Sequence, residues 1–384
     1  MLEQLNQMNW AKVKHAYGPA TDVPKDIQNL ASQDKKVRGK AMYNLCGNIF
    51  HQGTRYEATP YAIPFLLELL SSDTVQEKEE IILLLVNLAL GYEDEYLPQG
   101  VDPEQFRNDL LASEAKVTEE QRVNQQKFGF SYPALIQCYD IVLSGIPQLY
   151  AFLEADEPEL RNSAVFAMAW FPELAAQSFP KVLEYLEKSK VEMDHCHAIL
   201  SAGLLARNSR EDQDINPLRP YLAHESLLVR TCAAIALATN PLAPEVLQRL
   251  IEGITDDESL NFVEGIYFNE GRIGGYASLT LSNFGKQEKE TIIPALCQNL
   301  VSANTYQSLD ITRAILVILN SDRSQGIRHV GLNDLQAVEI AALEAIYQHG
   351  GWTIDGGEFV NYMNLLQSAG LPHTREDLGK YLGL

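Results

Sequence analysis

Apolar positions recur every three or four residues through most of the chain, and short polar turns separate the segments that carry them. Ala164, Ala167, Met168 and Phe171 show this spacing, which places their side chains on one face of a helix. The pattern predicts helices over 35–50, 74–90, 158–170, 192–206, 225–238, 271–284 and 306–319. Alanines recur in several of these segments, so we expect neighbouring helices to pack closely. No segment indicates a strand.

Prolines precede several of these helices in a common pattern, in which a leucine or other apolar residue follows within a few positions. The prolines concerned are Pro64, Pro147, Pro180, Pro244 and Pro294. Proline suits the first turn of a helix, where its missing N–H is not needed. Each proline therefore predicts the start of a first helix, and the chain divides into consecutive helix pairs.

A short motif repeats at the start of the second helices: an acidic residue in the turn, then Val/Leu-Arg, then alanine three residues on. The copies are Asp34…Arg38…Ala41, Asp156…Arg161…Ala164, Val229-Arg230…Ala233 and, more weakly, Asp310-x-x-Arg313-Ala314. A period of a few tens of residues is typical of stacked-helix solenoids. We therefore predict an all-α protein, a right-handed α–α superhelix of about eight to ten helix pairs that forms one solenoid over residues 1–384.

Two segments break the period. Residues 91–130 carry a polar helix around 103–125 and form either a degenerate repeat or an insertion, which in solenoids often serves binding. Residues 350–384 are expected to cap the solenoid, and Thr374-x-x-Asp377 predicts the start of their last helix.

The repeated motif resembles that of HEAT repeats. The resemblance implies an armadillo-like fold in which Arg38, Arg161, Arg230 and Arg313 form a ladder with acidic turn residues of neighbouring repeats. A narrower resemblance, to a group of bacterial HEAT-repeat proteins, rests on Trp10, His15-Ala16-Tyr17-Gly18, Gly47 to Thr59, Tyr139-Asp140 and Ala169 to Pro172. It implies a bacterial origin and no particular activity.

The charge is strongly acidic and uneven. The net charge is −21, and residues 58–384 hold 22 Lys and Arg against 46 Asp and Glu. Such a surface repels phosphate backbones, which disfavours nucleic acids and favours a basic protein partner. The alternative is that the charge only keeps the protein in solution.

Targeting and redox features indicate a cytosolic protein. The N-terminus lacks the basic start and apolar stretch of a signal peptide, and no apolar run has the length of a membrane span, so no membrane partner is expected. The five cysteines lie far apart without a C-x-x-C pair, so buried free thiols are expected.

The segment from Asn48 to Thr59 is the main candidate for binding, because it gathers polar and aromatic side chains at a helix end. Its candidate residues are His51, Gln52, Thr54 and Tyr56. The alternative is that His51 and Thr54 cap helix 35–50 and Tyr56 packs on the next repeat. Among aromatic residues, Trp170 is a candidate interface anchor, with core packing as its alternative. Tyr92, Tyr96 and Tyr132 are further candidates near the 91–130 segment.

A second segment, Glu192 to His197, has His and carboxylate residues at i,i+3 spacing, as in di-iron helices. His195 and His197 lie about 200° apart around a helix, so they cannot share one ion. Gly271-Arg272-Ile273-Gly274-Gly275 has glycine-loop spacing without a preceding strand, and we expect it to admit a close-packed helix start instead.

The function favoured by the sequence is a non-enzymatic protein–protein interaction module whose acidic concave surface binds a basic partner. It would act as an inhibitor or immunity-type protein or as an assembly scaffold, with no cofactor and no metal. The alternative is a HEAT-like enzyme related to bilin lyases, metal-dependent hydroxylases or DNA glycosylases.

Overall fold

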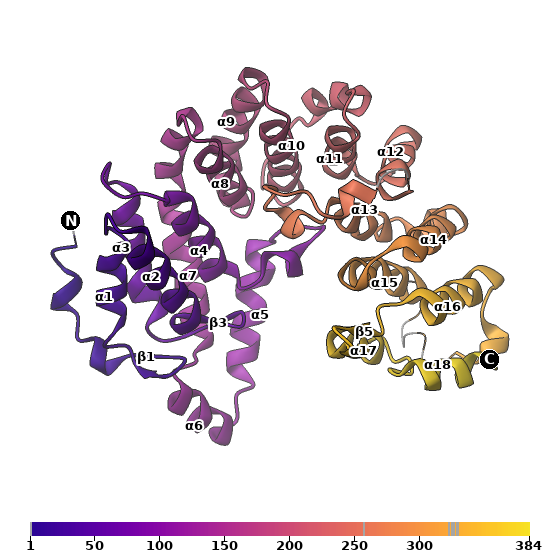
Figure 1. Ribbon diagram of the computed structural model, residues 1–384, viewed down its shortest axis with the longest axis horizontal. Helices are drawn as coiled ribbons and strands as arrows, with labels where there is room; N and C mark the ends of the chain where they lie inside the picture. The colour runs from indigo at the N-terminus through magenta and orange to yellow at the C-terminus, as the bar shows by residue number, and fades with distance from the viewer. Residues whose placement is uncertain (1, 256–257, 322, 324–326, 328–329) are drawn as a thin grey trace. The chain divides into compact units, whose positions relative to one another are not determined.

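The protein is all-α in a computed structural model, which describes every residue except 1, 256, 257, 322, 324–326, 328 and 329. Its contacts divide the chain into two compact units, Met1–Asp214 and Ile215–Leu384. Each unit consists of helices that alternate between two layers (Figure 1). None of the helices in the described part of the chain combines the length and apolar character needed to cross a membrane.

The first unit begins with two short 3-10 helices and a small hairpin, and continues as a succession of helices. Its α-helices are α1 (Val23–Asn29), α2 (Lys35–Asn48), α3 (Thr59–Leu70), α4 (Lys78–Leu90), α5 (Pro103–Ala115), α6 (Glu119–Phe128), α7 (Tyr132–Gly145), α8 (Pro158–Met168), α9 (Ala175–Lys188) and α10 (Glu192–Arg207). The 3-10 helices are η1 (Leu5–Gln7), η2 (Trp10–Lys12), η3 (Glu93–Tyr96), η4 (Ile146–Glu154) and η5 (Pro172–Leu174). Helix α8 packs against both α4 and α10, so the predicted second helices contact one another in series.

The second unit repeats this arrangement. Its α-helices are α11 (Leu227–Leu237), α12 (Pro244–Thr255), α13 (Ile273–Ser282), α14 (Gly285–Ser302), α15 (Thr305–Asn320), α16 (Ala337–His349), α17 (Val360–Ser368) and α18 (Arg375–Leu382). The 3-10 helices are η6 (Asn216–Ala223), η7 (Glu258–Asn261), η8 (Phe268–Gly271) and η10 (Leu332–Asp334). Helices α11, α13 and α15 form one row and α12, α14 and α16 the other (Figure 1).

Local sequence signals explain where the helices begin. The carboxylate of Asp34 accepts a hydrogen bond from Lys36 N at 2.9 Å and caps α2. Thr374 caps α18 in the predicted way, since its hydroxyl accepts from Asp377 N at 3.1 Å. Ala164, Ala167 and Ala233 are buried, as expected for residues at close helix contacts.

Three predictions about the fold are wrong in part. Three two-residue hairpins exist where no strand was expected: β1–β2 (Lys14–His15 with Gly18–Pro19), β3–β4 (Phe50–His51 with Thr54–Arg55) and β5–β6 (Thr353–Ile354 with Gly357–Glu358). They were missed because two-residue strands are too short to show an alternating pattern. The polar helix around 103–125 is two helices, because Thr118 and Gln121 form a capping box that starts α6.

The third error concerns the prolines. Pro64, Pro180 and Pro294 lie inside α3, α9 and α14, which begin several residues earlier. Pro147 starts a 3-10 helix, and Pro244 alone among the five begins an α-helix. An internal proline costs one backbone hydrogen bond, which these helices offset by burying apolar side chains on the adjacent turns.

Candidate functional site

The segment from Asn48 to Thr59 forms the β3–β4 hairpin. Phe50 pairs with Arg55 and His51 with Thr54. The two turn residues, Gln52 and Gly53, have φ values of 49° and 78°. Such a two-residue turn with both φ values positive matches the twist of the paired strands. The turn holds Gln52 at an exposed tip, with His51 and Thr54 half-buried beside it.

His51 lies next to Tyr17 of the β1–β2 hairpin. Their rings meet edge to face with centroids 5.5 Å apart, and the Tyr17 hydroxyl is 3.5 Å from His51 Nδ1. Tyr17 is 70% exposed, so a large aromatic side chain is presented to solvent on a supported hairpin. We did not predict Tyr17 as a binding residue from the sequence, where it contributed only to the family resemblance.

A polar network fixes the position of Tyr17. Tyr17 N donates to Nδ1 of buried His15 at 3.0 Å, so this ring nitrogen is an acceptor and Nε2 donates to Asp22 Oδ1 at 2.8 Å. The second oxygen of Asp22 accepts from Asn48 Nδ2 at 2.8 Å. Because Asn48 is the last residue of α2, the network ties one hairpin to the base of the other.

Tyr92 lies on the other side of the β3–β4 hairpin. Its ring meets Phe50 edge to face at 5.6 Å, and a Cβ atom on Gly53 would be 2.9 Å from Tyr92 Cε2. Tyr92 is 44% exposed and immediately precedes the acidic residues Glu93, Asp94 and Glu95 of η3. The structure therefore brings together two candidate segments that are about forty residues apart in sequence. We call Tyr17, His51, Gln52, Tyr92 and Glu93–Glu95 the hairpin surface.

Two predicted binding residues lie in the core instead. Tyr56 is 8% exposed, and its backbone N–H donates to Thr59 Oγ1 at 2.8 Å. Trp170 is fully buried and packs against Phe166 with ring centroids 5.7 Å apart. The expectation that they form part of a surface is wrong: Tyr56, between β4 and α3, and Trp170, after the end of α8, both pack inward, as their alternatives had it. Neither His51 nor Thr54 caps α2, whose C-terminus is closed by Ile49 N bonding to Leu45 O.

The other tyrosines near the 91–130 segment are half-buried. The Tyr96 hydroxyl donates to Leu90 O at 3.3 Å, and burial raises its pKa. Tyr132 meets Phe130 edge to face at 5.0 Å. Both tyrosines therefore serve local packing rather than an exposed binding surface.

The four arginines expected to form a ladder divide into two groups. Arg38 Nε donates to Glu77, at the start of α4, at 2.9 Å, and Arg161 Nη2 donates to Asp194 of α10 at 3.1 Å. The bond from Arg38 lowers the pKa of Glu77. Arg230 donates to the backbone oxygens of the turn before α11, and Arg313 is half-buried on α15. Only the first two therefore join successive helix pairs through a carboxylate.

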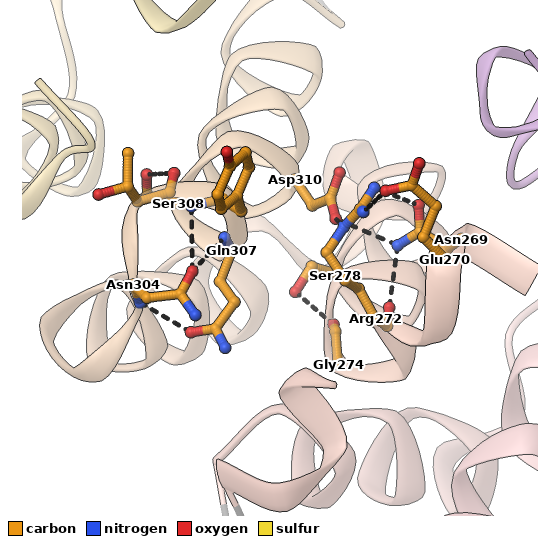
Figure 2. A network of polar contacts seen from close by, with 11 residues as sticks. Asn269, Glu270, Arg272, Gly274, Ser278, Asn304, Gln307, Ser308 and Asp310 are labelled. Atoms are coloured by element: carbon orange, nitrogen blue, oxygen red, sulfur yellow. Dashed lines mark hydrogen bonds and ion pairs between the residues drawn. The ribbon is translucent and has the colours of Figure 1, made fainter. Parts of the chain in front are cut away.

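In the second unit Arg272 takes the place expected for Arg313. Figure 2 shows Asp310 of α15 pointing toward Arg272 and Asn269. Arg272 Nε is 3.0 Å and Asn269 Nδ2 is 3.1 Å from Asp310 Oδ2. Gly275 makes this approach possible, because a Cβ there would lie 2.3 Å from the same oxygen. The glycine-rich segment thus admits a close-packed helix start, as predicted.

The metal-like segment on α10 is engaged in structural contacts. Asp194 accepts from Arg161 and Ser189, and Nδ1 of His197 bonds to Met193 O at 2.9 Å. Burial lowers the pKa of His197 to about 4. Within the described ranges, no three His, Cys, Asp or Glu residues are grouped so that they could hold a metal ion.

Comparisons with known proteins leave the family open. No protein-family model matches the chain, and no curated protein does. One similar solved structure is the crystal structure of an engineered protein, at 15% sequence identity, a TM-score of 0.31 and coverage of 94% of this chain and 97% of that one. At this TM-score the likeness supports no conclusion. Membership of the HEAT-repeat proteins stays a prediction.

Proposed function

We propose that this protein is a non-enzymatic binding module that holds a basic protein partner on its hairpin surface. The observation that carries the proposal is the pairing of exposed aromatic side chains with an adjoining acidic turn. Tyr17 and Tyr92 are exposed on either side of His51 and Gln52, and Glu93–Glu95 follow directly. Tyrosines of this kind are enriched among the residues that dominate binding energy.

Preorganisation favours binding at this surface. The β3–β4 turn is held between Tyr17 and Tyr92, and Asp22 ties the neighbouring hairpin to α2. Side chains that are already fixed lose little entropy when a partner binds. The two tyrosine rings would then supply apolar contact area, while the side chains of His51 and Gln52 would supply polar contacts.

Charge favours a basic protein as the partner. The net charge is −21, and the excess of acidic residues lies beyond residue 57. Acidic side chains next to the aromatic residues would attract Lys and Arg side chains and speed encounter with a basic protein. An inhibitor or immunity-type protein that masks a basic toxin or nuclease is one form of this function, and an assembly scaffold is the other. Nucleic acid is disfavoured by the same charge.

The proposal includes a finer description of the fold. We propose that the helix pairs are HEAT-like repeats of a right-handed superhelix. The rows α11–α13–α15 and α12–α14–α16, and the pairing of Arg38 and Arg161 with later helices, support it.

The test compares capture of basic proteins by three forms of the chain from a lysate of its source organism at low salt. The forms are wild type, Tyr17→Ala with Tyr92→Ala, and Tyr43→Ala, which removes a 73% exposed tyrosine of α2 outside the hairpin surface. We expect one stoichiometric basic protein on wild type and Tyr43→Ala, released by salt, and at least tenfold less on the double variant. Equal retention by all three forms, or retention that salt does not change, contradicts the proposal.

A further inference from the structure

The first unit contains a cleft of about 580 Å³, whose lining includes Arg55 of the β3–β4 hairpin and Glu95 of the hairpin surface. Strand β4, the end of α4, η3, α5 and α7 contribute residues to its lining. Leu90, Leu110, Leu135 and Phe106 give it apolar walls. Its charged lining residues are of both signs: they are Arg55 and the exposed Glu95, Asp102 and Asp109.

Arg55 is the unusual residue of this cleft. It is only 7% exposed, and its one hydrogen bond is from Nη1 to Gly53 O at 2.8 Å, while Nε has no hydrogen-bond partner. In the part of the chain that the structure describes, no carboxylate lies within 4.0 Å of its guanidinium. A buried charge without a counter-ion is costly, which is why buried arginines such as Arg38 normally have one.

The surrounding backbone is shaped to hold this guanidinium. Gly91 has a φ of 93°, and a Cβ atom there would lie 2.5 Å from Arg55 Nη1. A side chain at this position would therefore require the guanidinium of Arg55 to shift. Burial lowers the pKa of Arg55, yet an arginine stays charged at neutral pH, so its guanidinium can bind an anionic group.

We propose that the cleft binds a small molecule that carries a carboxylate at one end and a cationic group several carbon atoms away. The carboxylate would accept hydrogen bonds from Arg55, the preferred partner for planar anions. The methylene chain would contact the leucines and Phe106, and the cationic end would face Glu95 and Asp109.

Both charges of the ligand follow from the lining. A phosphate or other polyanion would be repelled by the three carboxylates, and a simple cation would leave the Arg55 guanidinium without a counter-ion. A ligand that carries both charges provides a partner for Arg55 and for the carboxylates. This inference shares Glu95 with the hairpin surface but does not depend on the proposed protein partner, because it rests on Arg55 and the cleft and needs none of the exposed tyrosines.

Isothermal titration calorimetry with three six-carbon probes tests the proposal. The probes are 6-aminohexanoate, hexanoate, which lacks the amine, and 1-aminohexane, which lacks the carboxylate. We expect 6-aminohexanoate to bind at least tenfold more tightly than either of the others, because each charged group adds a charge-assisted hydrogen bond. No binding of 6-aminohexanoate overturns the proposal, and so does equal binding of one of the singly charged probes.

Variants locate the site. Glu95→Gln with Asp109→Asn should weaken 6-aminohexanoate binding at least fivefold without changing the melting temperature, because both side chains are exposed. Glu104→Gln is the matched control. Glu104 is exposed and lies on α5, as Asp109 does, but it does not line the cleft, so this variant should bind 6-aminohexanoate as wild type does. Arg55→Lys should lose binding while circular dichroism verifies that it folds. If Glu95→Gln with Asp109→Asn binds 6-aminohexanoate with unchanged affinity, the proposed ligand site is wrong, even where Arg55→Lys fails to fold.

Discussion

Nε of Arg272 lies 3.0 Å from Oδ2 of Asp310, and this ion pair joins the start of α13 to α15 in the second unit (Figure 2). Both side chains are largely buried, at 16% and 4% exposed. Asn269 donates to the same oxygen while its own backbone has a φ of 50°, a conformation that non-glycine residues seldom adopt. The carboxylate therefore holds in place a turn that would otherwise be unfavourable.

Asp310→Asn should lower the free energy of unfolding by about 1–3 kcal/mol, because it removes the buried counter-charge of Arg272 and leaves the exposed Glu270 as its ion-pair partner. Urea denaturation followed by circular dichroism measures this. Asp334→Asn, at an exposed position, is the matched control and should change stability by less than about 0.5 kcal/mol. Equal effects of the two substitutions would show that the ion pair does not stabilise the unit.

Two glycine-to-alanine substitutions in helices should have opposite effects. Gly275→Ala places a Cβ 2.3 Å from Asp310 Oδ2 and should destabilise by about 1–3 kcal/mol, since the carboxylate must move. Gly39 lies inside α2 with nothing within 4 Å of its added Cβ, so Gly39→Ala should stabilise by about 0.5–1 kcal/mol. Melting temperatures of the two variants measure the contrast, and a stabilised Gly275→Ala protein would refute it.

His197 should make the protein less stable in mild acid. Burial lowers its pKa to about 4, whereas in the unfolded chain the pKa is about 6.5. Between these values the unfolded state binds the proton more readily, so stability is full above about pH 6.5 and falls as the pH drops toward about 4. The urea denaturation midpoint should therefore change less with pH in His197→Asn than in wild type. The same substitution at exposed His373 should leave this pH dependence as it is in wild type.

Glu339 should act at lower pH. Its burial disfavours the charged form, but hydrogen bonds from Arg323, Gln336 N and Lys289 outweigh this and lower its pKa to about 2. A carboxylate with a lowered pKa contributes stability above its unfolded value of about 4.3 and loses it as the pH falls toward about 2.

Glu339→Gln should therefore lower the free energy of unfolding by about 3–5 kcal/mol at pH 7. It should also lose less stability than wild type below pH 4.5. Glu344→Gln, on the same helix α16 and half-buried, is the control for the substitution itself. Acid titrations followed by circular dichroism compare the two. If Glu339→Gln unfolds in acid in parallel with wild type, this carboxylate is not the source of the loss of stability at low pH.

The amino-acid sequence by itself determined the helices and many of their boundaries. The apolar period marks which face of a segment is buried, and caps such as Asp34 and Thr374 act on backbone groups two or three residues away. These are local interactions, so they can be inferred without knowing the tertiary structure. The same reasoning correctly placed Gly275 at a close contact, but it did not predict the hairpin that carries His51 and Gln52.

Only the tertiary structure decided which distant residues meet. Tyr17, His51 and Tyr92 come together because two hairpins and η3 converge, and Arg272 rather than Arg313 engages a carboxylate of the next helix pair because of how α13 packs on α15. Trp170 is fully buried, an outcome that the sequence left open between a core and a surface position. Side-chain partners across helices depend on the distance and angle at which the helices pack, and residue spacing along the chain does not encode these quantities.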